Sequence, residues 1–108
     1  MMNDIKWSKA EKEVARRAFD SAYERECGAI RAKLQEMTAS ASQPADIWEI
    51  HDYLSDRRRA ADGKYDYRYS VLIMVFSRLI EEGWLTEPDL LGLGADKIEK
   101  IGQIVSWR

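Results

Sequence analysis

Residues 8–41 read SKAEKEVARRAFDSAYERECGAIRAKLQEMTASA, and this stretch decides the fold. Ser8 and Glu11 have the spacing of a capping box, in which each side chain accepts a hydrogen bond from the other residue's backbone N–H at the start of a helix. Apolar residues then recur with the spacing of one helical face: Phe19, Tyr23, Cys27, Ile30, Leu34, Met37 and Ala41. The pattern predicts one long helix over residues 8–41.

Such a helix is too long for a compact chain of 108 residues. At a rise of about 1.5 Å per residue it measures about 50 Å, whereas a compact domain of this size has a radius of gyration of roughly 13 Å. Part of the helix must therefore project and bury its apolar stripe against another surface. Because two-fold homodimers are the most common oligomers, we expect a homodimer.

The chain after this helix contains start and stop signals for further helices. Pro44 suits the first turn of a helix over residues 44–61, and Gly63 is a good left-handed cap after it. Asp66 is the expected N-cap of a third helix, which ends at Gly83.

The third helix has an apolar centre over residues 71–76, which a buried strand would also produce. A helix is preferred because Leu79, Ile80 and Trp84 continue a helical pattern and no second strand is available for pairing. Thr86 is expected to cap a short helical segment. A last helix begins at about residue 95, and its expected buried side consists of Ile98, Ile101, Ile104 and Val105.

Taken together, these signals predict an all-α fold in a single domain over residues 1–108. A long N-terminal stalk helix spans about residues 8–41, and three to four further helices form a head over about residues 44–108.

The composition excludes several classes of function. With 17 basic and 19 acidic residues, a net charge of −2 provides no long-range field for nucleic acid or an anionic membrane. One cysteine cannot form an intrachain disulfide. The longest apolar run, residues 71–76, is far shorter than a membrane span, so we expect no membrane insertion and a cytoplasmic location.

The sequence offers little for catalysis or metal binding. One histidine, one cysteine and scattered carboxylates have no recognised metal-ligand spacing. A nucleophilic set of Cys27, His51 and Asp52 can be imagined, but Cys27 lies in an apolar stripe and is expected to be a small core residue. We therefore expect neither an enzyme nor a metal site.

Residues 47–68, IWEIHDYLSDRRRAADGKYDYR, form the most informative surface. On a helix that turns about 100° per residue, six of their side chains lie within an arc of about 120° and extend over about 16 Å. They are Trp48, His51, Asp52, Ser55, Arg58 and Arg59. Tryptophan and arginine dominate protein-binding hot spots, which makes this strip a candidate docking surface.

Two plainer interpretations of the same residues remain open. Trp48 could be a core residue and the arginines a solvated face. Arg57, Arg58 and Arg59 could contact nucleic-acid phosphates, although acidic residues interrupt them.

The stretch from Trp48 to Arg68 resembles the signature of the cyanobacterial fluorescence recovery protein family, most specifically in its W-x-x-H-D and D-G-K-Y-D pieces. The similarity extends over almost the whole chain, from Trp7-Ser8 to residues 95–97. The resemblance implies an all-helical homodimer with a long stalk helix, without a bound pigment or other cofactor. It implies binding to the photoactivated orange carotenoid protein, faster return of that protein to its inactive orange form, and its release from the phycobilisome.

Individual positions of the resemblance imply roles for named residues. Trp48, His51, Asp52 and Arg58 match the family's functional patch, and Lys100 matches a lysine implicated in partner contact. Ile47 matches a dimer-interface position, and Leu54, on the same face, is assigned to the interface with it. The alternative function is that of a family-like helical dimer which binds a different protein in a host that lacks the carotenoid protein.

Overall fold

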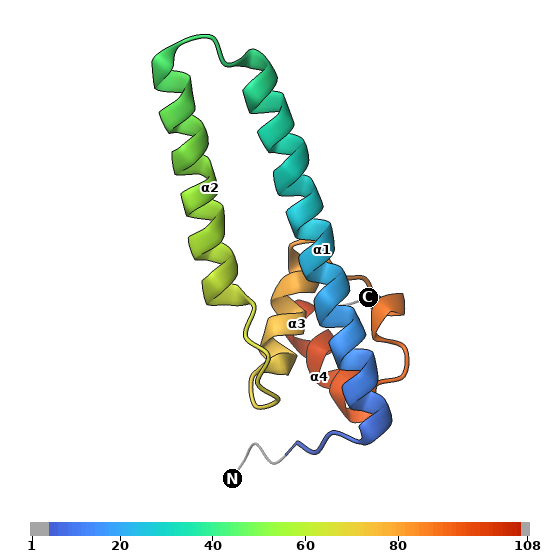
Figure 1. Cartoon of the computed structure of the whole chain (residues 1–108). Helices are drawn as coiled ribbons and strands as arrows, with labels where there is room; N and C mark the ends of the chain where they lie inside the picture. The colour runs from blue at the N-terminus through green and yellow to red at the C-terminus, as the bar shows by residue number, and fades with distance from the viewer. Residues whose placement is uncertain (1–4, 107–108) are drawn as a thin grey trace.

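The computed structural model describes residues 5–106 as helices joined by short connections (Figure 1). The elements in chain order are α1 (Lys9–Ser40), α2 (Pro44–Lys64), α3 (Leu72–Glu81), the 3₁₀ helix η1 (Glu87–Leu90) and α4 (Ala95–Val105). Among residues 5–106 no strand is formed, and the only β contact is an isolated bridge between Leu91 and Leu93. The predicted all-α fold with one long first helix is confirmed.

Helix α1 has the predicted ends, and its first turn also fastens α4. Ser8 Oγ accepts the Glu11 N–H at 3.1 Å, and Glu11 Oε1 accepts the Ser8 N–H at 2.9 Å. Glu11 Oε2 accepts the Gly94 N–H at 2.6 Å, and Lys97 Nζ donates to Glu11 Oε1 at 3.1 Å. These hydrogen bonds lower the pKa of Glu11 to about 2, and the one from the Ser8 backbone has the largest effect.

The long helix projects from the rest of the chain, as predicted. The molecule measures 54 × 26 × 25 Å and its radius of gyration is 17.0 Å, larger than the roughly 13 Å of a compact domain. Figure 1 shows α2 beside the second half of α1 as a hairpin, while α3, η1 and α4 surround the first half of α1.

The hydrophobic core lies in this second part, which we call the head. It is formed by one side of α1 together with α3, the η1 region and α4. The buried side chains are Trp7, Val14, Ala15, Ala18, Phe19, Ala22, Leu72, Ile73, Val75, Phe76, Leu79, Leu85, Leu90, Leu93 and Ile101. All of them precede residue 23 or follow residue 71, so the hairpin beyond the head has no core of its own.

The division into stalk and head differs from the prediction. Residues 44–64 were expected in the head, but α2 packs along α1 in the hairpin. The three-residue connection between α1 and α2, residues 41–43, is too short to take α2 back to the head except as an antiparallel neighbour of α1.

The boundary between the second and third helices also differs. Gly63 is not a left-handed cap, because α2 continues to Lys64. Asp66 is not an N-cap either: it pairs with Arg68, and α3 begins only at Leu72.

The intervening segment, residues 65–71, is irregular and ends in a turn, and its first tyrosines pack on α1. The Tyr65 and Tyr67 rings meet the Phe19 ring edge-on, with centroids 5.4 and 4.8 Å away. A tilted contact of 5.6 Å between Trp7 and Tyr69 continues this aromatic layer. Burial of these rings outweighs the helix signals of the local sequence.

The remaining helix signals are largely confirmed. The apolar stretch after residue 71 is helical, with Met74 facing solvent, and Gly83 ends α3 at φ +88°. Gly92 adopts φ +108°, and a Cβ there would lie 2.6 Å from Val14 Cγ2, so only glycine fits. Ile104 is the exception, because it is exposed where we predicted burial.

Candidate partner-binding surface on helix α2

A local hydrogen-bond cluster fixes the start of α2. Pro44 occupies the first turn, where no backbone N–H is needed. The Asp46 carboxylate accepts the N–H groups of Ser42 and Gln43 at 2.8 and 2.9 Å. Both hydrogen bonds lower the pKa of Asp46, which keeps a negative charge at the positive end of the helix dipole.

Most residues of α2 are exposed in the single chain, and the half-buried ones include Ile50, Tyr53 and Leu54. Lys64 is its one buried side chain, whereas Trp48 is 65% exposed and Ile47 is 53% exposed. The interpretation of Trp48 as a core residue is therefore wrong. Two large apolar side chains on adjacent exposed positions are typical of a surface that another protein covers.

The strip is made up of small local contacts. The rings of Trp48 and His51 meet edge-on, with centroids 6.5 Å apart. His51 Nδ1 lies 3.3 Å from Asp52 Oδ1, and both side chains are exposed. These three residues form one cluster with an aromatic, a titratable and an acidic group available to a partner.

The arginines of the strip pair with acids of the same helix. Arg58 Nε lies 3.1 Å from Asp62 Oδ2, and Arg59 Nη1 lies 3.1 Å from Asp56 Oδ1. Exposed pairs of this kind contribute no more than about 1 kcal/mol. Either guanidinium can therefore exchange its carboxylate for one on a partner at little cost.

The apolar stripe of α1 is only partly covered by α2. Ile30, Leu34 and Met37 are half-buried, while Tyr23 and Cys27 are exposed. The prediction that Cys27 is a core residue is therefore wrong. Leu54, the second assigned interface residue, is half-buried, and Lys100 is exposed on α4 in the head, outside the strip.

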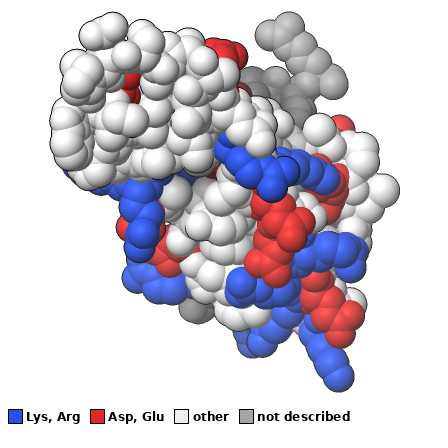
Figure 2. All heavy atoms as spheres, turned by 45° about the horizontal axis from the view of Figure 1, so that its top comes forward, with Lys and Arg blue, Asp and Glu red and all other residues white. Residues whose placement is uncertain are grey.

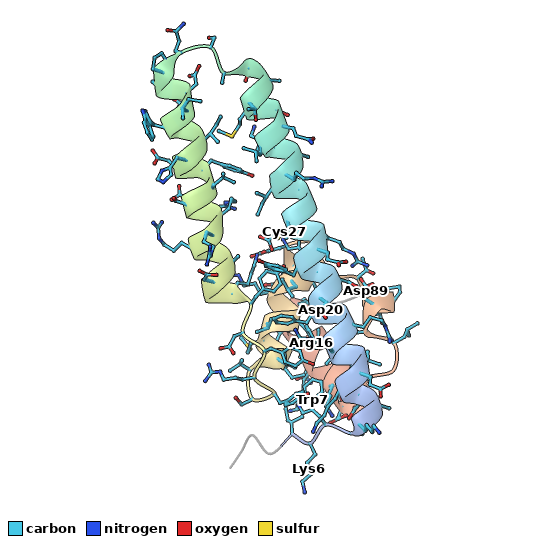
Figure 3. The ribbon with its side chains drawn as sticks, in the orientation of Figure 1. Lys6, Trp7, Arg16, Asp20, Cys27 and Asp89 are labelled. Carbon is cyan, nitrogen blue, oxygen red and sulfur yellow. The ribbon has the colours of Figure 1, made fainter. Side chains whose placement is uncertain are left out.

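The imagined nucleophilic set is not brought together. Figure 3 marks Cys27 on α1 just above the head, where its thiol raises the pKa of the neighbouring Tyr23. Arg58 and Asp62 of α2 also act on Tyr23, so Cys27 lies near that end of α2. His51 is seven or more residues away along α2, about 10 Å or more.

Two further properties of residues 5–106 bear on ligands. No group of three or more histidine, cysteine or acidic side chains is placed to hold a metal ion. None of the helices in this range is long and apolar enough to span a membrane.

One hollow lies away from the strip. It is an open groove of about 600 Å³ between the end of α2 and α3, with Val71, Met74, Val75 and Ile104 as its apolar lining.

Charges of both signs are mixed over the surface. Figure 2 shows Lys and Arg interspersed with Asp and Glu on the face drawn, without a continuous basic area. This arrangement does not favour binding to a phosphate backbone, which requires a concentrated basic surface.

Sequence reasoning did not identify the groups that join the hairpin to the head. Lys64 is buried between Glu26 and Glu82, and the Tyr65 hydroxyl donates to Glu26. The one usable signal was the alternation of Tyr65, Tyr67 and Tyr69, which does not have the spacing of a helical face.

Comparisons with known proteins agree on one family. The family model described as "Photoprotection regulator fluorescence recovery protein" matches residues 7–105. The fluorescence recovery protein of Synechocystis sp. is 43% identical over 95 residues, which are 88% of this chain and 87% of that protein.

Solved structures of the same family also match. The fluorescence recovery protein of Fremyella diplosiphon aligns with a TM-score of 0.87 and 46% identity, over 94% of this chain and all of the other. The Synechocystis sp. PCC 6803 protein aligns with a TM-score of 0.88 and 40% identity over the same shares.

Proposed function

The chain belongs to the fluorescence recovery protein family of photoprotection regulators, and we propose that it acts on the photoactivated orange carotenoid protein. In this role it accelerates conversion of that protein to its inactive orange form and promotes its release from the phycobilisome. The location that fits such a role is the cytoplasm. The observation that carries the proposal is the uncovered strip on α2 in a chain whose family is established.

The proposed action needs binding and no chemical step. A binder shifts a conformational equilibrium by the difference between its affinities for the two states. If it binds the transition state of relaxation more tightly than the activated state, it also accelerates the return. The protein is therefore proposed to be a non-enzymatic regulator without a cofactor.

We assign the roles within the strip from exposure and chemistry. Trp48 supplies the large apolar anchor, because it has the most uncovered apolar surface on α2. Asp52 and Arg58 supply charges of opposite sign, which select the partner's orientation. His51 lies beside Asp52 and against the Trp48 ring. Lys100 is proposed as a second contact from the head.

A homodimer is the second part of the proposal. The half-buried stripe of α1 and the exposed Ile47 leave apolar surface on the hairpin, which has no core of its own. An isologous contact through Ile47 and Leu54 would cover this surface with its counterpart in a second copy.

The test is a recovery assay with purified proteins. Orange carotenoid protein is converted to the red form by light, this protein is added, and the orange absorbance is followed in the dark. We expect faster recovery at substoichiometric to stoichiometric amounts. Buffer alone and a heat-denatured sample serve as controls.

An unchanged recovery rate with folded, dimeric protein would reject the carotenoid protein as partner. It would support the alternative, in which the same fold binds a different protein in its host.

A further inference from the structure

Lys64 lies where the hairpin meets the head, and it is almost completely buried. Its side chain is 3% exposed, and that of Glu26 on α1 is 9% exposed. Lys64 Nζ lies 2.7 Å from Glu26 Oε1 and 2.6 Å from Oε1 of Glu82, the residue that caps α3. One ammonium group therefore joins α1, α2 and α3.

Neighbouring donors complete this arrangement. The Tyr65 hydroxyl donates to Glu26 Oε1 at 2.7 Å, and Arg78 Nε donates to Glu82 Oε2 at 2.9 Å. Burial and the bond to Glu26 raise the pKa of Tyr65, so its hydroxyl stays a donor. We call Glu26, Lys64, Tyr65 and Glu82 the Lys64 clasp.

The clasp is better suited to fixing geometry than to adding stability. Buried ion pairs are often no more stabilising than well-packed apolar residues, because removing the charges from water is costly. An apolar contact tolerates sliding, however, whereas an ammonium held by two carboxylates requires each oxygen at hydrogen-bond distance. A lysine at this junction therefore restricts where the end of α2 can lie.

No comparable tie holds α2 to the head elsewhere among the described residues. Along its length α2 packs mainly against α1, and its other ion pairs lie within the helix itself. Because α1 runs unbroken through both parts, the position of the C-terminal end of α2 against the head depends on the clasp and on the tyrosine segment that follows it.

We propose that Lys64 is a positioning residue for partner binding. By holding Glu26 and Glu82 together, it fixes the α2 strip relative to the head surface that carries Lys100, so that one partner contacts both. Two contacts on a rigid frame bind more tightly than the same contacts on a loose one, because the second contact is then pre-aligned. The partner in this inference rests on the proposed function.

The principal test variant is Glu82→Gln, which weakens the tie to α3 and leaves the Lys64–Glu26 pair. Glu81→Gln is the matched control, since it removes the same charge from the adjacent residue, which has no ion pair in the described structure. Hydrogen exchange of the full-length protein is measured for both. In Glu82→Gln we expect exchange over residues 60–70 to rise roughly five- to tenfold above the control, with α4 unchanged.

The second variant is Lys64→Met with Glu26→Gln, which removes both buried charges and leaves an acceptor for Tyr65. It should keep the helix content and show the same local rise in exchange. If this variant fails to fold, Glu82→Gln decides the question.

The partner-dependent readout is a double-mutant cycle in the recovery assay, with Arg58→Ala and Lys100→Ala as the two substitutions. In the native background, the fold-decrease in recovery rate of the double variant should be several-fold smaller than the product of the fold-decreases of the two single variants. The reason is that aligned contacts depend on each other. In the Glu82→Gln background, the fold-decreases in recovery rate of the two single variants should simply multiply. Glu82→Gln alone should give recovery that is about threefold slower than with the native protein.

The outcomes separate this inference from the proposed function. Equal exchange over residues 60–70 in Glu82→Gln and Glu81→Gln overturns it, and so does native recovery despite raised exchange. If the native protein does not accelerate recovery at all, the proposed function fails. The exchange comparison then decides whether Lys64 fixes the end of α2 against the head.

Discussion

Arg58→Ala should separate partner binding from folding. Arg58 is 80% exposed and its one ion pair is with Asp62, itself 67% exposed, at 3.1 Å. Such a pair within a helix contributes about 0.3–0.5 kcal/mol. For a domain of this size, the midpoint of thermal unfolding should therefore fall by no more than about 2–4 °C.

The effect on partner binding should be much larger. Truncation to alanine of an arginine hot spot that is buried in a complex costs about 2 kcal/mol or more of binding free energy, because its hydrogen bonds and its packing are lost together. At about 1.4 kcal/mol per factor of ten, this corresponds to roughly 30-fold weaker binding. Recovery of the orange form at a fixed, subsaturating concentration should slow accordingly.

The assay compares Arg58→Ala with Arg57→Ala, which also removes one positive charge from α2. Arg57 points about 100° away around the helix, outside the strip. Circular dichroism and light scattering verify that both variants keep their helix content and association state. Equal losses in the two variants would mean that net charge, and not the strip, governs binding. A large fall in helix content for Arg58→Ala would mean that the residue is structural.

Three further predictions concern assembly and stability. Ile47→Glu places a charge in the proposed interface and should give monomers in light scattering; a dimer would show that the interface lies elsewhere. Leu79→Ala removes a fully buried side chain and should cost about 2–5 kcal/mol in urea unfolding, whereas the exposed Met74→Ala should cost less than about 1 kcal/mol; equal costs would contradict the described core. Glu11 has a pKa of about 2 against an ordinary 4.5, so its contribution to stability is complete above about pH 5 and is lost as the pH falls towards 2. Glu11→Gln should therefore be less stable than the native protein at pH 7 and about equal to it near pH 2, and a constant difference would refute the assignment.

The sequence was sufficient to predict the helix ends and the α2 strip, where local signals and burial agree. Ser8 and Glu11 marked the start of α1, and Gly83 marked the end of α3, because caps and positive φ angles depend on neighbouring residues alone. The strip on α2 was also predictable, since positions on one helix follow from its period.

The sequence failed where distant residues decide the conformation. Gly63 looked like a helix end, but Lys64 extends the helix to reach Glu26, 38 positions earlier. Asp66 looked like a cap, but the tyrosines around it pack on Phe19. Cys27 looked buried because it continues an apolar stripe, yet it is exposed in the described part of the chain. Periodicity indicates which residues share a face and not what lies against that face.

The exposure of α2 links the proposed dimer to the proposed partner surface. A helix with one buried side chain gains little from tertiary packing, which supplies most of the stability of helices in proteins. Covering Ile47 and Leu54 with a second copy would therefore order the same backbone that presents Trp48 and Arg58. Loss of the dimer should then weaken partner binding indirectly, even if the partner never touches Ile47.

For this reason the Ile47→Glu variant has to be judged together with hydrogen exchange over α2. Raised exchange with weak binding would indicate a disordered strip, whereas native exchange with weak binding would place Ile47 in the partner contact itself.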